Sequence, residues 1–136
     1  MLTQNYINGI AYRIVGGAIE VHKNLGPGLL ESVYQQCFEE ELSSRNLKFQ
    51  SQVRVPVLYK GKDLGGHLIV DILVEDLIVV ELKAVEAMIP LYQAQLLSYL
   101  KLTDKPKGLL INFNCENITK NLVPLVTEKF NELPKE

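Results

Sequence analysis

The chain has few cysteines, no tryptophan, no long apolar run and no strong net charge. Cys37 and Cys115 are the only cysteines among its 136 residues. Two cysteines so far apart form neither a disulfide framework nor a C-x-x-C motif for zinc or redox chemistry. We expect two partly buried thiols in a reducing cytosol. The net charge of −2 excludes an overall basic surface of the kind that attracts nucleic acid, so any such contact must be local.

Two further absences concern targeting and membranes. Residues 1–9 lack a basic segment followed by an apolar one, so no signal peptide is predicted. The longest apolar runs fall far short of a membrane span. Hydrophobic residues make up 47% of the chain and charged residues 22%, which is typical of a globular domain with a sizeable core. We therefore expect a single domain over residues 1–136, located in the cytoplasm.

Hydrophobic periodicity predicts two helices in the first third of the chain. Apolar residues recur at i, i+3, i+4 and i+7 between residues 6 and 24, as in an amphipathic helix. Gly16-Gly17 inside this helix indicates close packing against a neighbour, and Gly26-Pro27-Gly28 ends it. A second helix is predicted from Leu29 to about Arg45. Its predicted apolar stripe is Leu30, Val33, Cys37 and Leu42.

The hydrophobic period then changes from 3.6 to 2, which indicates strands. The first predicted strand covers residues 53–59, and Pro56 within it favours an edge position or a bulge. After a turn at residues 60–63, a second strand is predicted over about 66–74 and a third over about 77–83.

The last third of the chain predicts one more helix and one more strand. Pro90 opens a helix that runs to about Leu102, and residues 108–113 read as a short buried strand. The tail from about Asn121 has only a weak helical pattern that is expected to fray. The predicted order is α-α-β-β-β-α-β, an α/β fold with helices beside one mixed sheet.

Three charged residues interrupt the apolar hairpin of residues 67–84. Asp71, Glu81 and Lys83 would be costly to bury without partners. Glu81 and Lys83 share a face because side chains alternate along a strand. Asp71 joins that face only if the paired residue numbers of the two strands sum to an even value. A three-residue loop at 75–77 or 74–76, or a bulge, meets this condition, whereas a regular two-residue turn does not.

These residues have the chemistry of a Mg²⁺ (or Mn²⁺) site beside a catalytic lysine. Mg²⁺ commonly binds one or two carboxylates together with substrate phosphates, so Asp71 and Glu81 are candidate ligands, with the Leu82 carbonyl as a further one. Such a metal polarises a scissile phosphate and lowers the pKa of a bound water. Lys83 would stabilise developing phosphate charge, or position and help deprotonate the attacking water. Alternatively, Glu81 and Lys83 could form an ordinary charge pair on the surface of a strand.

Two helix motifs supply further candidates. G-L-L-E-S-V-Y places Glu31 and Tyr34 at i, i+3 on one helix face. Gln95 and Tyr99 stand at i, i+4 on the helix after the third strand, where Gln95 would lie against the carboxylate face. An ordinary alternative stays open for each motif: a solvent-facing glutamate beside a core tyrosine, and a helix with a polar edge.

Taken in order, the motifs resemble those of a known family. G-L-L-E-S-V-Y resembles the signature of the GxxExxY proteins. D-I-L-V-E-D-L-I-V-V-E-L-K-A resembles the core motif of the PD-(D/E)XK nuclease superfamily, and A-Q-L-L-S-Y-L followed by G-L-L-I-N-F is similar to later blocks of the GxxExxY proteins. The resemblance covers roughly residues 8–120. Val70 stands where the superfamily motif begins with proline.

The resemblance implies a restriction-endonuclease-like α-β-β-β-α-β core with an extra N-terminal helix, and Mg²⁺-dependent phosphodiester hydrolysis. It assigns Asp71, Glu81 and Lys83 to the core triad. It makes Glu31 the helix carboxylate that assists the metal site, and Gln95 the residue that orients Lys83 or a phosphate.

The leading hypothesis is therefore a metal-dependent nuclease that acts on DNA or RNA. A homodimer would supply the two sites needed to cut both strands of a duplex. The alternative is a catalytically inactive nucleic-acid- or protein-binding module on the same fold, and a third reading is a subunit of a larger assembly. Candidate phosphate contacts, with solubilising side chains as the alternative, are Arg54, Lys60, Lys62, Lys101, Lys105, Lys107 and, near the end of the chain, Lys120.

Overall fold

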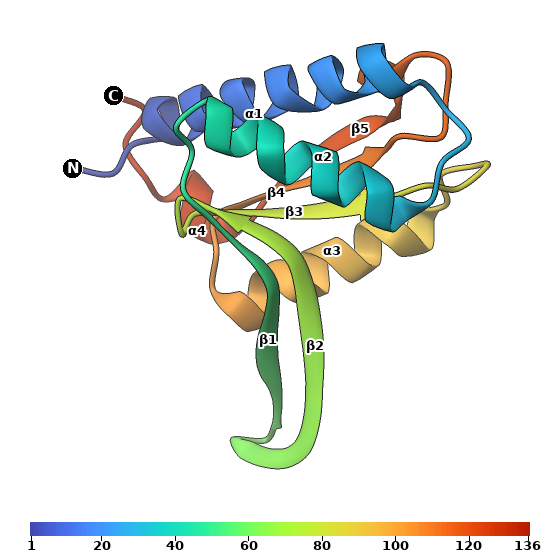
Figure 1. The fold of residues 1–136 in the computed structure, drawn as a ribbon. Helices are drawn as coiled ribbons and strands as arrows, with labels where there is room; N and C mark the ends of the chain where they lie inside the picture. The colour runs from blue at the N-terminus through green and yellow to red at the C-terminus, as the bar shows by residue number, and fades with distance from the viewer.

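The computed structural model describes all 136 residues and contains one mixed five-stranded sheet (Figure 1). Its helices are α1 (Gln4–Leu25), α2 (Glu31–Ser44), α3 (Pro90–Thr103), the short α4 (Glu128–Asn131) and the 3-10 helix η1 (Ile118–Asn121). Its strands are β1 (Phe49–Tyr59), β2 (Lys62–Val74), β3 (Ile78–Lys83), β4 (Lys107–Asn112) and β5 (Leu122–Val126). No helix has the length and apolar character required to cross a membrane.

The strands follow one another across the sheet in sequence order, β1-β2-β3-β4-β5. Only β3 and β4 are parallel, and α3 connects them. Helices α1 and α2 cover one face of the sheet and α3 covers the other (Figure 1). Strand β3 is therefore buried on both faces, which explains why its sequence is an apolar run interrupted mainly by Glu81 and Lys83.

The predicted α/β class and the order α-α-β-β-β-α-β are confirmed. The core order runs from α2 through β4, and α1 is the extra N-terminal helix. Pro56 lies in the edge strand β1, and the register between β1 and β2 shifts between Pro56 and Leu58. Both features expected from this proline are therefore present.

Two expectations about local structure are wrong. The tail forms β5, which pairs antiparallel with β4, before a single helical turn at α4. Its Pro124 is tolerated because β5 is an edge strand. In α2, Leu30 is 74% exposed because it precedes the first helical turn, whereas Tyr34 and Phe38 are fully buried. The apolar stripe is thus centred on aromatic residues, and Val33 and Cys37 lie half-buried at its side.

The close contact predicted at the glycine pair of α1 is present. A Cβ atom on Gly17 would lie 3.4 Å from Glu41 Cγ and 3.6 Å from a ring carbon of Phe38, both in α2. The absence of a side chain therefore lets α1 and α2 pack closely over the sheet. This packing fixes the position of α2, whose first turn carries Glu31.

Candidate functional site

The turn between β2 and β3 has the odd length that the site requires. Glu75 and Asp76 both adopt positive φ angles, of 52° and 57°, and the Leu77 N–H donates to the Val74 carbonyl at 3.0 Å. Val74 then pairs with Ile78 across a three-residue loop. The paired numbers sum to an even value, as predicted, and this register brings Asp71 level with Glu81.

The backbone pairing between β2 and β3 ends at Ile72. Beyond it, the side chain of Asp71, and not the backbone of β2, accepts the next hydrogen bond from β3. Ile72 pairs with Val80, and the next N–H of β3 in that direction, that of Leu82, donates to Asp71 Oδ2 at 2.9 Å. The N–H and carbonyl of one residue in an antiparallel ladder point toward the same neighbouring strand. The Leu82 carbonyl therefore lies on the Asp71 side of β3, where the sequence predicted it as a ligand.

Glu81 is an almost fully buried carboxyl group, with 6% of the residue exposed. Loss of hydration is the main cause that raises the pKa of Glu81 to about 9. A hydrogen bond with the Asp71 side chain and the Asp71 charge raise it further, while Lys83 opposes the shift. In the metal-free protein, the Asp71–Glu81 pair therefore holds a proton near neutral pH, because two adjacent carboxylates resist joint ionisation.

Glu31 lies in the first turn of α2, where the charges of Asp71 and Lys83 act on its carboxyl group. The residue is exposed, yet partial loss of hydration raises the pKa of its carboxyl, as does the nearby Asp71, whereas Lys83 lowers it. Glu31 is not gathered with Asp71 and Glu81 into a cluster of three metal-binding side chains. The structure thus places Glu31 beside the carboxylate pair and outside its immediate contact.

Lys83 is held by two side chains of α3, and a third supports one of them. Its ammonium group donates to Gln95 Oε1 at 3.4 Å and lies 4.5 Å from the centre of the Tyr92 ring, a cation–π distance. Gln95 Nε2 in turn donates to the Tyr99 hydroxyl at 3.3 Å. Gln95 therefore lies beside the charged strand, as predicted, and Tyr99 contacts it from one turn further along α3.

Three residues that support the site were missed from the sequence. Tyr92 could have been found from its spacing of three residues before Gln95 on the same helix face. Gln35, one turn after Glu31, donates to the Asp71 carbonyl at 3.3 Å. Buried Asn112 accepts from the Val85 N–H at 3.0 Å and donates to the Val85 carbonyl at 2.9 Å, which fixes the chain just after Lys83. No local pattern distinguishes Asn112.

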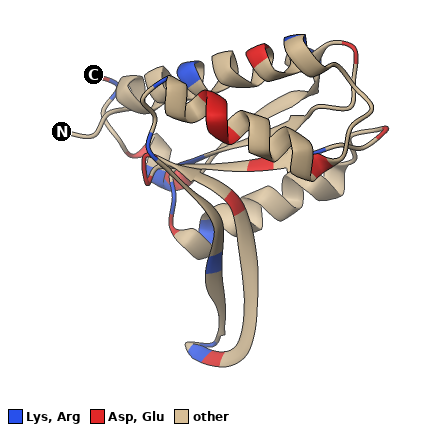
Figure 2. Ribbon diagram, viewed as in Figure 1, with Lys and Arg blue, Asp and Glu red and all other residues tan.

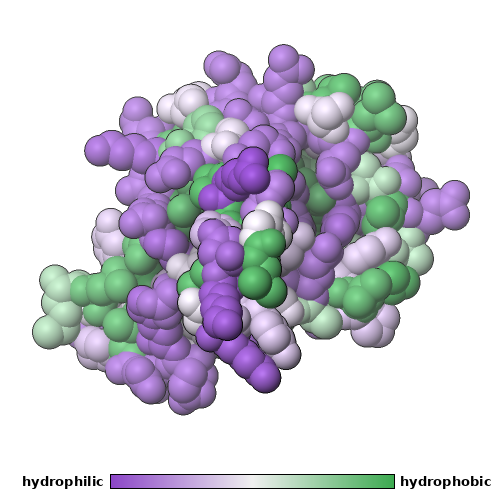
Figure 3. Space-filling view, turned by 90° about the horizontal axis from the view of Figure 1, so that it is seen from below, coloured by the Kyte–Doolittle hydropathy of each residue, from purple (hydrophilic) through white to green (hydrophobic).

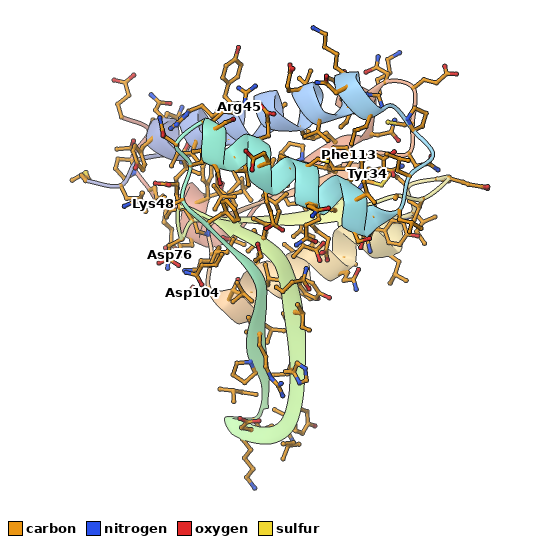
Figure 4. The ribbon with its side chains drawn as sticks, viewed as in Figure 1. Tyr34, Arg45, Lys48, Asp76, Asp104 and Phe113 are labelled. Carbon is orange, nitrogen blue, oxygen red and sulfur yellow. The ribbon has the colours of Figure 1, made fainter.

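Tyr34 supports the site from the core. Its ring is fully buried and stacks on Phe113 with 4.8 Å between ring centres (Figure 4). Its hydroxyl donates to the Gly26 carbonyl at 2.6 Å and accepts from the Leu29 N–H at 3.2 Å. The loop between α1 and α2 is therefore tied to the core immediately before Glu31.

Replacing Tyr34 with phenylalanine should destabilise the protein by about 1–2 kcal/mol, because two hydrogen bonds are lost while the stacked ring remains. Urea unfolding followed by circular dichroism measures this change. Tyr12→Phe is the matched control, since Tyr12 is 82% exposed and should lose almost nothing. Equal unfolding free energies for the two variants would contradict the role assigned to Tyr34.

The Asp71–Glu81 pair fits a divalent cation. Glu81 is buried beside a second carboxyl, and its pKa is strongly raised although Lys83 is near, so the positive charge of Lys83 compensates the pair only in part. The Leu82 carbonyl adds a neutral oxygen, and a set of one or two carboxylates with water suits Mg²⁺. These residues would hold the metal, with Glu31 near enough to act electrostatically on it.

The candidate site is not part of an enclosed pocket. None of the five surface pockets of the molecule is lined by Asp71, Glu81 or Lys83. Sites for small molecules are concave and enclose most of their ligand. The site therefore lacks the concave lining that is typical of a small-molecule site.

The predicted basic residues do not gather into one patch. Lys105 is paired with Asp76 at 2.9 Å, and Lys107 is half-buried, with its ammonium group 3.0 Å from Asn8 Oδ1. Arg54, Lys60 and Lys62 instead lie on the long hairpin of β1 and β2. Cys37 and Cys115 are free, half-buried thiols, as expected.

Comparison with known proteins agrees with the geometry of this site. A family model described as PD-(D/E)XK nuclease superfamily matches residues 8–123, which includes every residue of the site. Comparisons with curated proteins and with solved structures gave no significant match. Since the family model spans most of the chain, and Asp71 of β2 with Glu81 and Lys83 of β3 follows the order that the superfamily name describes, the chain belongs to the PD-(D/E)XK nuclease superfamily.

Proposed function

We propose that the protein is a Mg²⁺- or Mn²⁺-dependent nuclease that hydrolyses phosphodiester bonds in nucleic acid. The observation that carries this proposal is the pairing of buried Glu81 with Asp71 on the neighbouring strand, with Lys83 two residues after Glu81 on β3. An ion pair on a solvated strand would not bury Glu81 or raise its pKa. Membership of the superfamily supports the same chemistry.

Each residue of the site has a distinct task in this proposal. Asp71, Glu81 and the Leu82 carbonyl would hold the metal, and Glu31 would add negative potential that strengthens the site. A bound divalent cation polarises the scissile phosphate and lowers the pKa of a coordinated water. The N–H of Leu82 fixes the Asp71 side chain at 2.9 Å, so at least one ligand is positioned before substrate arrives.

Lys83 would act on the reacting groups. Its ammonium group would neutralise charge that develops on the phosphate oxygens, or orient the water that attacks phosphorus. That water adds to phosphorus, the P–O bond to the leaving sugar oxygen breaks, and a proton passes to the leaving oxygen. Gln95 and Tyr92 restrict the position of Lys83 and are positioning residues.

Several finer points belong to the same proposal. The G-L-L-E-S-V-Y segment supports assignment to the GxxExxY proteins within the superfamily. We infer that the protein acts in the cytoplasm and that a homodimer would cut both strands of a duplex. The alternative of a catalytically inactive binding module is favoured by the net charge of −2, and the experiment below distinguishes it from a nuclease.

The purified protein should cleave labelled nucleic acid with Mg²⁺ or Mn²⁺, and cleavage should stop when EDTA is added. Single- and double-stranded DNA and RNA serve as substrates, and products are resolved by denaturing electrophoresis. Glu81→Ala should abolish both cleavage and Mn²⁺ binding measured by calorimetry, because it removes a metal ligand. Glu40→Ala is the control, since Glu40 is an exposed carboxylate on α2.

The outcomes separate the two functions. Cleavage by wild type and Glu40→Ala, and none by Glu81→Ala, supports a nuclease. A binding module would bind nucleic acid without cutting it and would be indifferent to Glu81→Ala. A protein that neither cleaves any of the four substrates nor binds Mn²⁺ contradicts the proposal.

A further inference from the structure

The hairpin of β1 and β2 extends far beyond the sheet. Only residues 72–74 of β2 pair with β3, whereas β1 and β2 continue to pair with each other as far as Tyr59 and Lys62. Figure 1 shows this hairpin bending away from the sheet and projecting past α3. We call residues 52–70 the arm. At the rise of a β-strand, the eight residues from Gln52 to Tyr59 span about 25 Å.

The base of the arm is fixed to the candidate active site. Gln35 of α2 donates to the Asp71 carbonyl at 3.3 Å, and Gln52 donates to Gln35 Oε1 at 3.1 Å. Gln52 has a positive φ of 51°, at the place where the hairpin bends. The arm thus leaves the sheet next to Asp71, so a molecule that contacts the base of the arm lies close to the carboxylate pair.

The arm has one covered face and one open face. Near its base, Val53, Val55, Leu68 and Val70 pack against the hydrophobic cluster of α3. Paired residues share a face of a hairpin, and the pairs Arg54–Ile69 and Pro56–His67 lie on the opposite, exposed face. The face that carries Arg54 and His67 is therefore free to contact another molecule.

The arm is basic in an acidic protein. It contains Arg54, Lys60 and Lys62 against the single acid Asp63, which gives +2 in a chain whose net charge is −2. Neither Arg54 nor the two lysines take part in an ion pair, and the Asp63 carboxylate accepts from the Gly65 N–H at 2.9 Å. Figure 2 shows the blue positions on β1 and at the tip. The remaining residues carry a net charge of −4, so the arm has the opposite net charge to the rest of the chain.

The tip combines these charges with exposed apolar side chains. Leu58, Tyr59 and Leu64 are 55%, 61% and 71% exposed. Viewed toward the tip, the centre of the molecule is mainly hydrophilic, with a smaller hydrophobic group beside it (Figure 3). Such a surface can contact phosphates through its cations and base edges or sugars through its apolar groups.

We propose that the arm enters the major groove of duplex DNA next to the cleavage site. A two-stranded ribbon fits the major groove of B-form DNA, which is about 12 Å wide, whereas the major groove of A-form RNA is too narrow for side chains to read. Lys60, Lys62 and Arg54 would contact phosphates along the groove. The inference rests on the proposed function for its nucleic-acid substrate and narrows that substrate to double-stranded DNA.

The test compares binding without cleavage, by fluorescence anisotropy in EDTA, for duplex DNA, single-stranded DNA and duplex RNA. Lys60→Ala/Lys62→Ala should weaken duplex DNA binding by roughly three- to tenfold. The slope of log K against log salt concentration should become shallower by about the amount expected for two lost phosphate contacts. Lys23→Ala/Lys135→Ala is the control, because it removes the same charge at two exposed positions outside the arm that form no ion pair. Binding of single-stranded DNA should change little in either variant.

A second variant tests the arm without relying on its charges. Replacing residues 58–65 with Asn-Gly joins Val57 to Gly66 through a two-residue turn, which suits the register of Pro56 with His67. This shortened protein should lose most duplex DNA binding while it still cleaves single-stranded DNA with Mn²⁺. Circular dichroism and thermal unfolding verify that it folds.

The outcomes distinguish this inference from the nuclease proposal. If duplex DNA binding depends on the arm but the protein cleaves no substrate, the proposed role of the arm is supported and the proposed nuclease activity is contradicted. Unchanged duplex binding by both arm variants, or equal losses for duplex and single strand, would overturn the inference. So would a wild-type dimer that the shortened arm converts to monomer without loss of DNA binding, because the arm would then contact a second copy of the chain.

Discussion

Replacing Lys83 with methionine should lower the rate of phosphodiester cleavage by about 10²–10³-fold, the usual effect of removing one group that stabilises transition-state charge. Methionine keeps an unbranched side chain that can still pack on Tyr92, but it carries no ammonium group to approach a phosphate. Single-turnover cleavage with saturating Mn²⁺ measures the effect on the chemical step. Substrate binding should change little, because the lost interaction is made mainly in the transition state.

Two comparisons make this prediction specific to Lys83. Lys135→Met removes an exposed positive charge at the C-terminal end of the chain and should cleave like wild type. Mn²⁺ binding by Lys83→Met should be retained or slightly tighter, since the positive charge near the carboxylates is gone. Loss of metal binding in Lys83→Met, or cleavage at the wild-type rate, would contradict a role in catalysis.

The core of the site could be predicted because its parts obey simple periodic rules. Alternation along β3 places Glu81 and Lys83 together, and pairing parity restricts the loop before them to an odd length. The structure meets that condition with Glu75 and Asp76 at positive φ, although neither is glycine. The sequence indicated which loop lengths were compatible with a site, but not the backbone conformation that produces one of them.

The arm and the support of the site could not be predicted in the same way. The pattern of β1 and β2 predicts a hairpin, but the bend at Gln52 depends on contacts with Gln35 of α2, a residue distant in sequence. A core tyrosine at position 34 was one of the alternatives left open by the sequence, but its stacking partner Phe113, in the segment that follows β4, was not predicted. These features arise from tertiary packing, which overrides the local pattern.

The tail shows how a weak pattern misleads. Residues 122–126, L-V-P-L-V, contain a proline that argues against a central strand, and the segment is short. The edge of β4 nevertheless provides a ladder of backbone partners, and β5 pairs there over five residues. Pairing with an existing strand supplies the hydrogen bonds that an isolated segment of this length lacks.

In the metal-free protein, the free energy of unfolding should fall as the pH rises from about 5 to about 9, and Glu81 should be the main cause. Its folded pKa of about 9 exceeds the ordinary value of a glutamate. Between those two pKa values the folded protein holds a proton that the unfolded chain has released. Stability therefore decreases with pH, by about 1.4 kcal/mol per pH unit for one full proton, and a few kcal/mol are lost over the window.

Glu81→Gln isolates this contribution. Glutamine has nearly the same shape and stays neutral, so the variant should have a flatter stability profile and should exceed wild type most at high pH. Urea unfolding in EDTA at several pH values gives both profiles, and Glu40→Gln serves as the control with an exposed carboxylate. Parallel profiles for wild type and Glu81→Gln would contradict the shifted pKa.

Addition of Mg²⁺ should restore stability at high pH in wild type but not in Glu81→Gln. The cation replaces the proton shared by Asp71 and Glu81, so its affinity should rise with pH. A ligand at 100 times its Kd stabilises a protein by about 2.7 kcal/mol, which offsets part of the loss at alkaline pH. Wild type should therefore be stabilised by Mg²⁺ more at pH 9 than at pH 6, whereas Glu81→Gln should gain little at either. A gain of equal size in both proteins would place the cation elsewhere on the molecule.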